Sequence, residues 1–403
     1  MFLFVAFFDL HAQYPMLSPF ALSLGAAPSF IGLVLGVYSI THLPGNMMAG
    51  YGVDKYGSKP FIVLSLILAG IVLIFQSHVT NPWQLLVIRS ISGFVLAFLS
   101  PACLSLLAKI ASDRVQQGKL MAGNGLVHTL ASVVSPAAGA YLVAKLGFST
   151  SFTVLGWVLV ATGVLAMFGI REHGRGRTPN ASEDHGPAAG RSALPARESL
   201  PAREPSTARM PTETALPVQV GQPAVFAGVP WLFFGIPLAI SCSQGILFFE
   251  LPLIHAAQKS ILTSGILFSL VSLGALFTLS MMFLNRLSPF HRTLAGSLSL
   301  ALIFYGMAVH WSIPLTASLF LIGMAKGVTL PAMSTLLATI TASSRYGRVF
   351  SILSISSSLG AFFGPILAGQ LRMHVSPYFI AFVGLMLALA MLPFHRIKTA
   401  VAA

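Results

Sequence analysis

Apolar stretches of about 20 residues recur along almost the whole chain, and short polar stretches separate them. A helix of that length matches the hydrocarbon core of a bilayer. The pattern therefore predicts an all-α membrane protein with twelve membrane-spanning helices. The expected spans are Phe2–Ser23, Ser29–Ala49, Phe61–Phe75, Trp83–Ala108, Leu120–Val143, Ser149–Ile170, Val229–Ile254, Ile261–Leu284, Thr293–Trp311, Ile313–Ile340, Val349–Leu371 and Tyr378–Pro393.

One long segment, residues 171–227, interrupts this pattern after the sixth span. It is rich in Pro, Ala, Arg and Glu and has no apolar period, a composition that does not support a packed core. We therefore expect residues 1–170 to form an N-terminal six-helix bundle, residues 171–227 a flexible cytoplasmic linker, and residues 228–403 a C-terminal six-helix bundle. The first span begins at Met1 without a basic leader, so no cleaved signal peptide is expected, and an upstream start stays open.

The two halves share residues at a nearly constant offset. A Gly, a Pro and the tripeptide Leu-Leu-Ala of the fourth span recur 230 residues later in the tenth span. A Pro of the fifth span recurs 229 residues later in the eleventh. Several matches at one offset indicate a duplicated six-helix unit, an organisation common among secondary transporters. The single-residue pairs are Gly93 and Gly323, Pro101 and Pro331, and Pro136 and Pro365.

The composition supports a membrane protein and excludes several other classes. Hydrophobic residues make up 55% of the chain and charged residues 8%, whereas a soluble domain has roughly 25% charged residues. The net charge of +13 is not accompanied by a basic face or an aromatic–basic module, so nucleic acid is not an expected partner. The sequence contains no phosphate-binding loop and no metal-ligand cluster, and its two cysteines have no disulfide spacing. We therefore expect no cofactor and no ATP-driven pumping.

Lysine and arginine are distributed unequally between the two sides of the predicted membrane. Eighteen of them lie on the side that holds residues 50–60, the linker and both termini, and three lie on the other side. Positive residues are enriched in cytoplasmic loops, so both termini and the linker are predicted to be cytoplasmic in a multi-pass protein of the inner membrane. The three residues on the opposite side are Lys145, Lys259 and Arg372.

A short charged turn, residues 50–60, separates the second and third apolar runs. Its glycines allow the backbone to turn or to approach a neighbour closely. Taken alone, the turn is a membrane loop with positive ends, as any multi-span protein has. Its informative residues are spaced Gly-x-x-x-Asp-Lys-x-Gly-Ser-Lys and are Gly50, Asp54, Lys55, Gly57, Ser58 and Lys59.

That spacing resembles motif A of the major facilitator superfamily, Gly-x-x-x-Asp-Arg/Lys-x-Gly-Arg-Arg/Lys, and it lies where that family has it, between spans two and three. In the family, the aspartate and the basic residues latch the cytoplasmic face while the other face is open. The resemblance implies this role for Asp54, Lys55 and Lys59. Ser58 departs from the usual basic residue and removes one contact from the latch.

Three further stretches resemble the same superfamily, and together the resemblance covers the chain outside the linker. Arg89-x-x-x-Gly93 in span four is similar to motif B, and the stretch from Ser135 to Gly139 in span five resembles the core of motif C. Residues 14–19, followed by Leu-Gly, look like the first-span pattern of the twelve-span drug:proton antiporters. The resemblance implies the major facilitator fold, two pseudo-symmetric six-helix bundles. We expect three glycines and two prolines to serve helix packing and bending, namely Gly93, Pro136, Gly139, Gly364 and Pro365.

Four charged residues fall within the predicted spans, and each is a candidate for function. An ionisable side chain in the hydrocarbon region costs about 2.5–3.5 kcal/mol on insertion scales, so it is rarely placed there without a role. The resemblance implies that spans one, four, seven and ten line the central cavity, and these are the spans that carry the four charges. They are Asp9, Arg89, Glu250 and Lys326.

The roles of these four residues differ in how far the sequence constrains them. Asp9, in a cavity of low dielectric constant beside a cation, is expected to bind and release a transported proton as its exposure changes. Arg89 stays charged at any working pH and serves either as its counter-ion or as a ligand of an anionic substrate group. For Glu250, a cavity role and a place at the external rim are equally favoured. For Lys326, near the midplane, a substrate or counter-ion role is favoured over a lysine that extends to the interface.

Three histidines also lie within the spans, and a neutral packing role is the commoner fate of such residues. His11 is the best exception, because it is two residues from Asp9 and can titrate near neutral pH. Residues two apart diverge on a helix, so the pair can share a face only if the prolines at positions 15 and 19 distort the first span. The other two are His42 and His128.

These observations favour transport over other classes of membrane function. The first hypothesis is a proton-coupled efflux transporter for amphipathic compounds, a monomer whose partners are a small-molecule substrate, protons and the lipid bilayer. The second is uptake or facilitated transport of a sugar, an organic anion or a lipid. A membrane enzyme or a receptor is disfavoured, because no catalytic cluster and no large external loop is apparent. The direction of transport and the identity of the substrate stay open.

Overall fold

The structure, a computed structural model, describes residues 2–110, 114–170, 231–254, 260–281, 286–341 and 346–392. Helices account for nearly all of these residues and no strand occurs among them, so the predicted all-α class is confirmed. Two short 3-10 turns, η1 (Trp231–Phe234) and η2 (Leu251–Leu253), flank α8. The α-helices are α1 (Phe2–Ala12), α2 (Tyr14–Ser23), α3 (Pro28–Tyr56), α4 (Lys59–Gln76), α5 (Pro82–Leu96), α6 (Leu99–Ile110), α7 (Arg114–Gly169), α8 (Gly235–Glu250), α10 (Ile261–Ser280), α11 (Pro289–Ala308), α12 (Leu315–Ile340), α13 (Tyr346–Leu371) and α14 (Pro377–Ala390).

Ten of the twelve predicted spans overlap a described helix or pair of helices of their own, and the fifth and sixth both lie in α7. The first span is divided into α1 and α2 at Gln13, two residues before Pro15, and the fourth span is divided into α5 and α6. By length and composition alone, seven stretches of the described helices are apolar enough to cross a membrane, and one of them, Gly123–Gly169, contains two predicted spans. The other spans belong to helices that are shorter (α1, α2 and α14) or less apolar (α3 and α11). The predicted linker lies outside the described residues.

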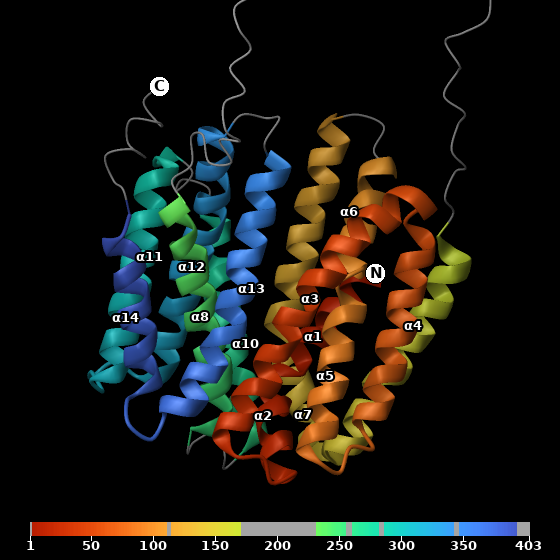
Figure 1. The fold of residues 1–403 in the computed structure, drawn as a ribbon, viewed down its shortest axis with the longest axis horizontal. Helices are drawn as coiled ribbons and strands as arrows, with labels where there is room; N and C mark the ends of the chain where they lie inside the picture. Colours follow the sequence, from red (N-terminus) through yellow and green to blue (C-terminus); the bar gives the residue numbers. More distant parts are fainter. Residues whose placement is uncertain are drawn as a thin grey trace, which may run out of the picture. The chain divides into compact units, whose positions relative to one another are not determined.

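The two halves repeat the same set of helix pairings. In the first half α1 packs on α7, α3 on α5, and α4 on α7. In the second half the corresponding pairs are α8 with α13, α10 with α12, and α11 with α14. Figure 1 shows the helices of the first half, coloured red to yellow, beside those of the second half, coloured green to blue. The pairings agree with the duplication that the 230-residue offset predicts.

The helix ends fall on two faces because successive spans alternate in direction. We name the linker face after the ends that flank the linker, Gly169 and Trp231; the turn between α3 and α4 also lies there (Figure 1). We name the other the far face; it holds the turns after α2, α4 and α11. On this face the 56-residue helix α7 reverses at Gly147, whose φ of 79° is accessible mainly to glycine.

Two helix pairs make the most extensive contacts between the halves, α3 with α13 and α7 with α10. In each pair a glycine of one helix lies against a proline of the other: Gly32 against Pro365, and Gly265 against Pro136. A Cβ atom at Gly265 would stand 2.5 Å from the carbonyl oxygen of Pro136, closer than real contacts allow. All four residues lie in the parts of their helices nearer the far face. The halves are therefore held backbone to backbone on that side.

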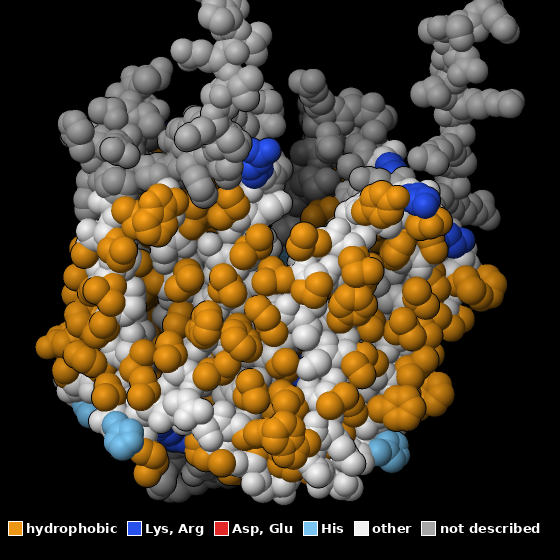
Figure 2. Space-filling view, in the orientation of Figure 1, with side chains coloured by type: hydrophobic (Ala, Val, Ile, Leu, Met, Phe, Trp, Pro, Cys, Tyr) orange, Lys and Arg blue, Asp and Glu red, His pale blue; other side chains and the backbone are white. Residues whose placement is uncertain are grey.

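The outward surface of the helices is apolar. Figure 2 shows hydrophobic side chains over most of the visible face, while the visible Lys and Arg side chains lie toward its upper and lower edges. Large apolar side chains on it are more than half exposed, which in water would be an aggregation hazard but in a bilayer is contact with lipid. Examples are Leu64, Phe75, Val87, Trp157 and Phe168.

Candidate functional site

Two hollows lie next to each other where the halves meet. The first has a volume of about 410 Å³ and the second about 340 Å³. Between them stand Tyr14 of α2 and Phe248 of α8, whose rings stack with their centroids 4.2 Å apart. The stack joins one half of the protein to the other. The four residues that line both hollows are Leu10, Tyr14, Gln244 and Phe248.

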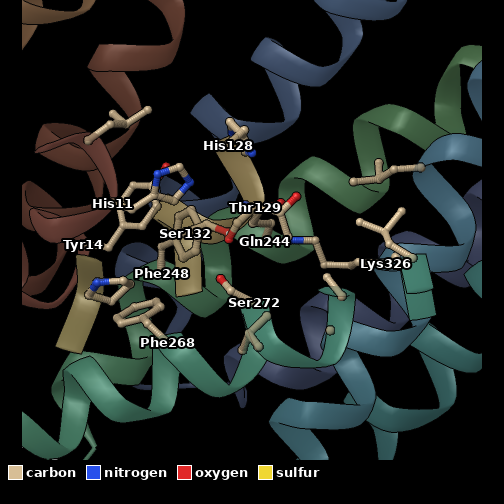
Figure 3. A pocket seen from close by; sticks show the side chains of 18 of the residues that line it. His11, Tyr14, His128, Thr129, Ser132, Gln244, Phe248, Phe268, Ser272 and Lys326 are labelled. Atoms are coloured by element: carbon tan, nitrogen blue, oxygen red, sulfur yellow. The ribbon is translucent and has the colours of Figure 1, made fainter. Parts of the chain in front are cut away.

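The first hollow is polar at one end and aromatic at the other. Figure 3 shows the side chain of Lys326 extending from α12 toward Gln244 and Thr129. Hydroxyl groups of Ser132 and Ser272 also line this part. The aromatic residues of the hollow are Tyr14, Phe248 and Phe268.

Two histidines face each other in the wall of the first hollow. The ring centroids of His11 and His128 are 5.1 Å apart, with the rings nearly perpendicular. The Nδ1 of His11 donates a hydrogen bond to the carbonyl oxygen of Phe7, at 2.7 Å. In the neutral ring this leaves the Nε2 of His11 as an acceptor. The pair therefore supplies polar groups that do not need to carry charge.

Asp9 and Arg89 are connected through a third side chain, Gln13. The Gln13 amide donates to Asp9 Oδ2 at 2.9 Å, and Arg89 Nη1 donates to Gln13 Oε1 at 3.0 Å. All three side chains are buried, and the Arg89 guanidinium also lies 4.8 Å from the ring centre of Tyr38. Asp9 Oδ1 and Arg89 Nε are buried and have no hydrogen-bond partner among the described residues. The acid and the base thus share one polar chain without direct contact.

The hydrogen-bonded series of Asp9, Gln13 and Arg89 lies beside the second hollow. Gln13, Arg89 and Tyr38 line that hollow, whereas Asp9 lies behind Gln13 and lines neither hollow. His42, which also lines the second hollow, is hydrogen-bonded to Asn46 at 2.9 Å. Any exchange of a proton between Asp9 and the hollow therefore has to pass Gln13 or await a change of conformation.

Glu250 lies apart from both hollows. Its carboxylate forms an ion pair with Arg372 Nη2 at 3.3 Å, in a separate pocket lined also by Trp311 and Tyr378. Arg372 Nη2 also donates to the carbonyl oxygen of Leu253 at 3.4 Å, which ties η2 to the turn after α13 on the far face. The structure thus brings Asp9 and Arg89 into one chain and places Glu250 elsewhere.

Replacing Arg372 with alanine is expected to lower the thermal stability of the purified protein more than replacing Glu250 with glutamine. The first change leaves the mostly buried carboxylate without a counter-ion, whereas the second removes the charge. The Arg372 and Glu250 side chains are only 27% and 11% exposed, so the double-mutant coupling should exceed the roughly 0.2–1 kcal/mol of exposed ion pairs. Thermal unfolding of the two single variants and the double variant checks this. A loss of transport in Glu250→Gln with unchanged stability would instead place Glu250 in the transport path.

The charged turn of residues 50–60 lies on the linker face. Lys55 is exposed and its ammonium lies 5.2 Å from the ring centre of Tyr56. Gly57 ends α3 with a φ of 91°, a conformation that favours glycine. Ser58 is buried, and its hydroxyl accepts a hydrogen bond from Lys109 Nζ of α6 at 3.4 Å. A basic side chain of α6, one residue beyond the predicted fourth span, therefore approaches the position where Ser58 replaces the family's basic residue.

The remaining residues of this turn are less informative. Gly50 has open space around its Cα, and Lys59 begins α4. The backbone of Asp54 belongs to α3, and its side chain lies outside the described part of the structure. The latch contacts of motif A thus stay a prediction.

The small residues expected to serve packing all lie at close helix contacts. Gly93 lies against α3, and its counterpart in the repeat, Gly323, lies against α10. Gly139 lies against the backbone of Ala12, and Gly364 lies against that of Cys242. Gly93 and Gly323 therefore make corresponding contacts in the two halves, while Gly139 and Gly364, which do not match at the 229-residue offset, join corresponding helix pairs. Pro136 and Pro365 both lie at the junction between the halves.

Several residues of the site were not singled out by the sequence patterns. Gln13 had a usable signal, because a glutamine four residues after an aspartate can bond to it on a helix. Phe248 had none; Tyr14 belongs to the pattern of residues 14–19, but its stacking on Phe248 depends on how the halves meet. Gln244 and Phe268 likewise read as ordinary span residues. Among the described residues no cluster of His, Cys, Asp and Glu could hold a metal ion.

Comparison with known proteins finds relatives that are named as multidrug resistance proteins. Multi-drug resistance efflux pump PmrA of Streptococcus pneumoniae is 22% identical over 356 residues, covering 87% of this chain and 82% of that protein. Multidrug resistance protein MdtG of Citrobacter koseri is 28% identical over 140 residues, covering 35% of this chain and 34% of that protein.

Solved structures share the fold at low sequence identity. A bacterial homologue of the human lysosomal transporter Spinster, in an inward-facing and occupied conformation, aligns with a TM-score of 0.71 at 13% identity, covering 100% of this chain and 95% of that one. A D-xylose–proton symporter aligns with a TM-score of 0.72 at 14% identity, covering 98% and 96%. These likenesses concern the fold alone.

The profile of one protein family matches nearly the whole sequence. It aligns with residues 1–314 and 290–401. The match agrees with the duplicated helix pairings and with the motifs in spans one to five. The chain belongs to the Major Facilitator Superfamily, a family of membrane transporters.

Proposed function

We propose that the protein is a secondary active transporter that exports amphipathic small molecules in exchange for protons by alternating access. The substrate site is the pair of hollows between the halves. The linker face is cytoplasmic, and the protein works as a monomer in the inner membrane with both termini in the cytoplasm. The proposal keeps the division into residues 1–170, a linker of residues 171–227, and residues 228–403.

The observation that carries the proposal is the asymmetric closure of the site. Near the far face, glycine–proline contacts join the halves on both sides of the hollows. Toward the linker face, Gly45 and Gly52 of α3 lie against Phe94 and Phe61, which belong to the same half. A central site closed on one face is what alternating access requires of one of its two end states.

The chain from Asp9 through Gln13 to Arg89 supports proton coupling. A buried carboxylate with one unpartnered oxygen can take up a proton without losing an existing hydrogen bond. Arg89, at the other end of this hydrogen-bonded series, stabilises the ionised form of Asp9, and its charge is no longer balanced when Asp9 is protonated. Protonation of Asp9 would therefore change the charge seen by the second hollow.

The second candidate function is uptake or facilitated transport of a sugar, an organic anion or a lipid. It is favoured by the two basic side chains, Arg89 and Lys326, that line the hollows. The fold does not discriminate between the candidates, since a D-xylose–proton symporter shares it with this chain.

A vesicle assay separates the candidates. The purified protein is reconstituted into vesicles with an imposed pH gradient and offered dyes, sugars and lysolipids. We expect the gradient to drive amphipathic dyes against protons, and an ionophore that collapses the gradient to stop this movement. Movement of sugars or lipids alone, or movement that ignores the gradient, would contradict proton-coupled efflux and favour the second candidate.

A further inference from the structure

The first hollow presents a positive charge that no described carboxylate balances. Lys326 is the single lysine or arginine among the described residues that line it, and no aspartate or glutamate of that part of the chain does so. We propose that this hollow binds the acidic group of an amphipathic organic anion at Lys326, and that such anions are substrates. The inference rests on the proposed transport function and narrows it to molecules that carry negative charge.

Lys326 is too deep to place its charge in the water at a membrane surface. It lies near the middle of α12, about 16 Å of helix rise from the nearer end, Leu315, which exceeds the length of a lysine side chain. Its ammonium is therefore directed into the hollow, as Figure 3 shows. An unbalanced charge at this depth is unfavourable. An acid group of a ligand would supply the missing counter-charge.

The helix that carries Lys326 is held close to its neighbour. Gly323 and Gly327 lie against the backbone of α10, and a Cβ atom at Gly327 would stand 2.7 Å from the carbonyl oxygen of Ala275. Larger residues at either position would push α12 away from α10. The glycines thus fix the starting point of the Lys326 side chain relative to Ser272 of α10, which lines the same hollow.

Hydrogen-bond donors near Lys326 suit an anion. Gln244 and Ser272 line the hollow and are not hydrogen-bonded to any other described residue, so the amide and the hydroxyl can donate to a ligand. Thr129 and Ser132 already donate their hydroxyl hydrogens to carbonyl oxygens of their own helix, at 2.9 and 2.8 Å. An ammonium with two neutral donors is a favourable environment for a carboxylate or sulfonate.

The other end of the hollow suits an apolar body. The ring of Phe268 lies 5.5 Å from that of Phe248 and 6.2 Å from that of Tyr14, so three aromatic side chains form one wall. The volume of about 410 Å³ is typical of sites for small organic molecules. A ligand that combines one acid group with an aromatic or aliphatic body therefore satisfies both ends.

The second hollow lacks an equally available cation. Arg89 donates to Gln13, which bonds to Asp9, and its guanidinium lies over Tyr38. Its charge is therefore already partly compensated. Because Arg89 has these partners and Lys326 has none among the described lining residues, we assign the anion to Lys326 and keep Arg89 in the proton-coupling series with Gln13 and Asp9.

A matched pair of fluorescent probes tests the inference. The anion 8-anilinonaphthalene-1-sulfonate and the neutral N-phenyl-1-naphthylamine share one aromatic body and differ by the sulfonate. Binding of each to the full-length protein in lipid nanodiscs is measured by equilibrium dialysis, with empty nanodiscs as the background. The variants are Lys326→Met, which removes the charge, and Lys326→Arg, which keeps it. Lys145→Met is the control, because it removes an exposed lysine outside the hollows.

We expect Lys326→Met to weaken binding of the sulfonate by about tenfold or more, because a charge-assisted contact is lost. Binding of the neutral probe should change by less than about twofold, since its contacts are apolar. Lys326→Arg should retain most of the sulfonate affinity, and Lys145→Met should behave as the unaltered protein. Retained binding in Lys326→Arg also demonstrates that position 326 tolerates substitution.

Two results would overturn the inference. One is that the unaltered protein binds the sulfonate no better than empty nanodiscs do. The other is that Lys326→Met weakens both probes equally or neither. Failure of the proposed transport function looks different: sulfonate binding that depends on Lys326 would persist, while reconstituted vesicles would move neither probe under any gradient.

Discussion

Replacing Asp9 with asparagine is expected to abolish transport driven by a pH gradient while the protein still inserts and folds. The asparagine amide oxygen can accept the Gln13 hydrogen bond that Asp9 Oδ2 accepts now, at 2.9 Å, so the local structure should persist. An amide cannot bind and release a proton in the working pH range, so the link between gradient and movement is lost. Uptake by reconstituted vesicles with an acidic interior measures the effect, and we expect a signal equal to that of empty vesicles.

A second measurement separates lost coupling from lost folding. Exchange of labelled substrate between vesicles and medium at equal pH needs the moving halves but not a net proton transfer, so Asp9→Asn should retain it. Glu250→Gln is the matched control, because it makes the same acid-to-amide change in the separate pocket beside Arg372. Gradient-driven transport at the normal rate in Asp9→Asn would refute the assignment of Asp9.

Replacing Gly32 with alanine is expected to open the far face. An added Cβ would meet the Pro365 carbonyl group, with its carbon at 2.8 Å, and backbone atoms cannot turn aside as a flexible side chain can. Overpacking of this kind costs about 1–3 kcal/mol, and it acts only in the state where α3 and α13 touch here. The ratio of the state open on the far face to the state closed there should therefore rise about 5- to 150-fold.

Cysteine labelling in intact cells measures this shift. Cys103 and Cys242 are replaced by serine, and a reporter cysteine is placed at Ala275, which lines the first hollow. A membrane-impermeant maleimide added outside should then react faster in the Gly32→Ala background. Gly384→Ala is the control, because nothing lies within 4 Å of the position of its added Cβ. Equal labelling rates in the two backgrounds would contradict the closure proposed for Gly32.

The fold was predictable because the bilayer imposes a simple rule on sequence. A span has to be apolar over about 20 residues, so the number and order of the helices could be predicted directly from the hydrophobic pattern. The breaks within spans were harder to predict. Pro15 indicates a distortion of the first span, but the sequence does not indicate that Gln13 is the junction of α1 and α2. The position of this junction depends on how the helices of both halves pack around the first span.

The site was predictable where charge is rare and unpredictable where partners are distant in sequence. Asp9, Arg89 and Lys326 are conspicuous because charged residues are only 8% of the chain. Glu250 was conspicuous for the same reason, but its partner, Arg372, is far along the chain and was assigned only to an external loop. Local patterns do not report which helix ends meet across a bundle.

The reversal of α7 at Gly147 has a consequence for how the protein is made. The fifth and sixth spans are joined without any separate loop, because one glycine with a φ of 79° reverses the helix. A polar loop between two spans can stay in water while the second span is synthesised. The junction at Gly147 contains almost no polar loop. We therefore expect the two spans to enter the bilayer together as one helical hairpin. Foreign sequence inserted at this junction should impair biogenesis before it affects any transport step.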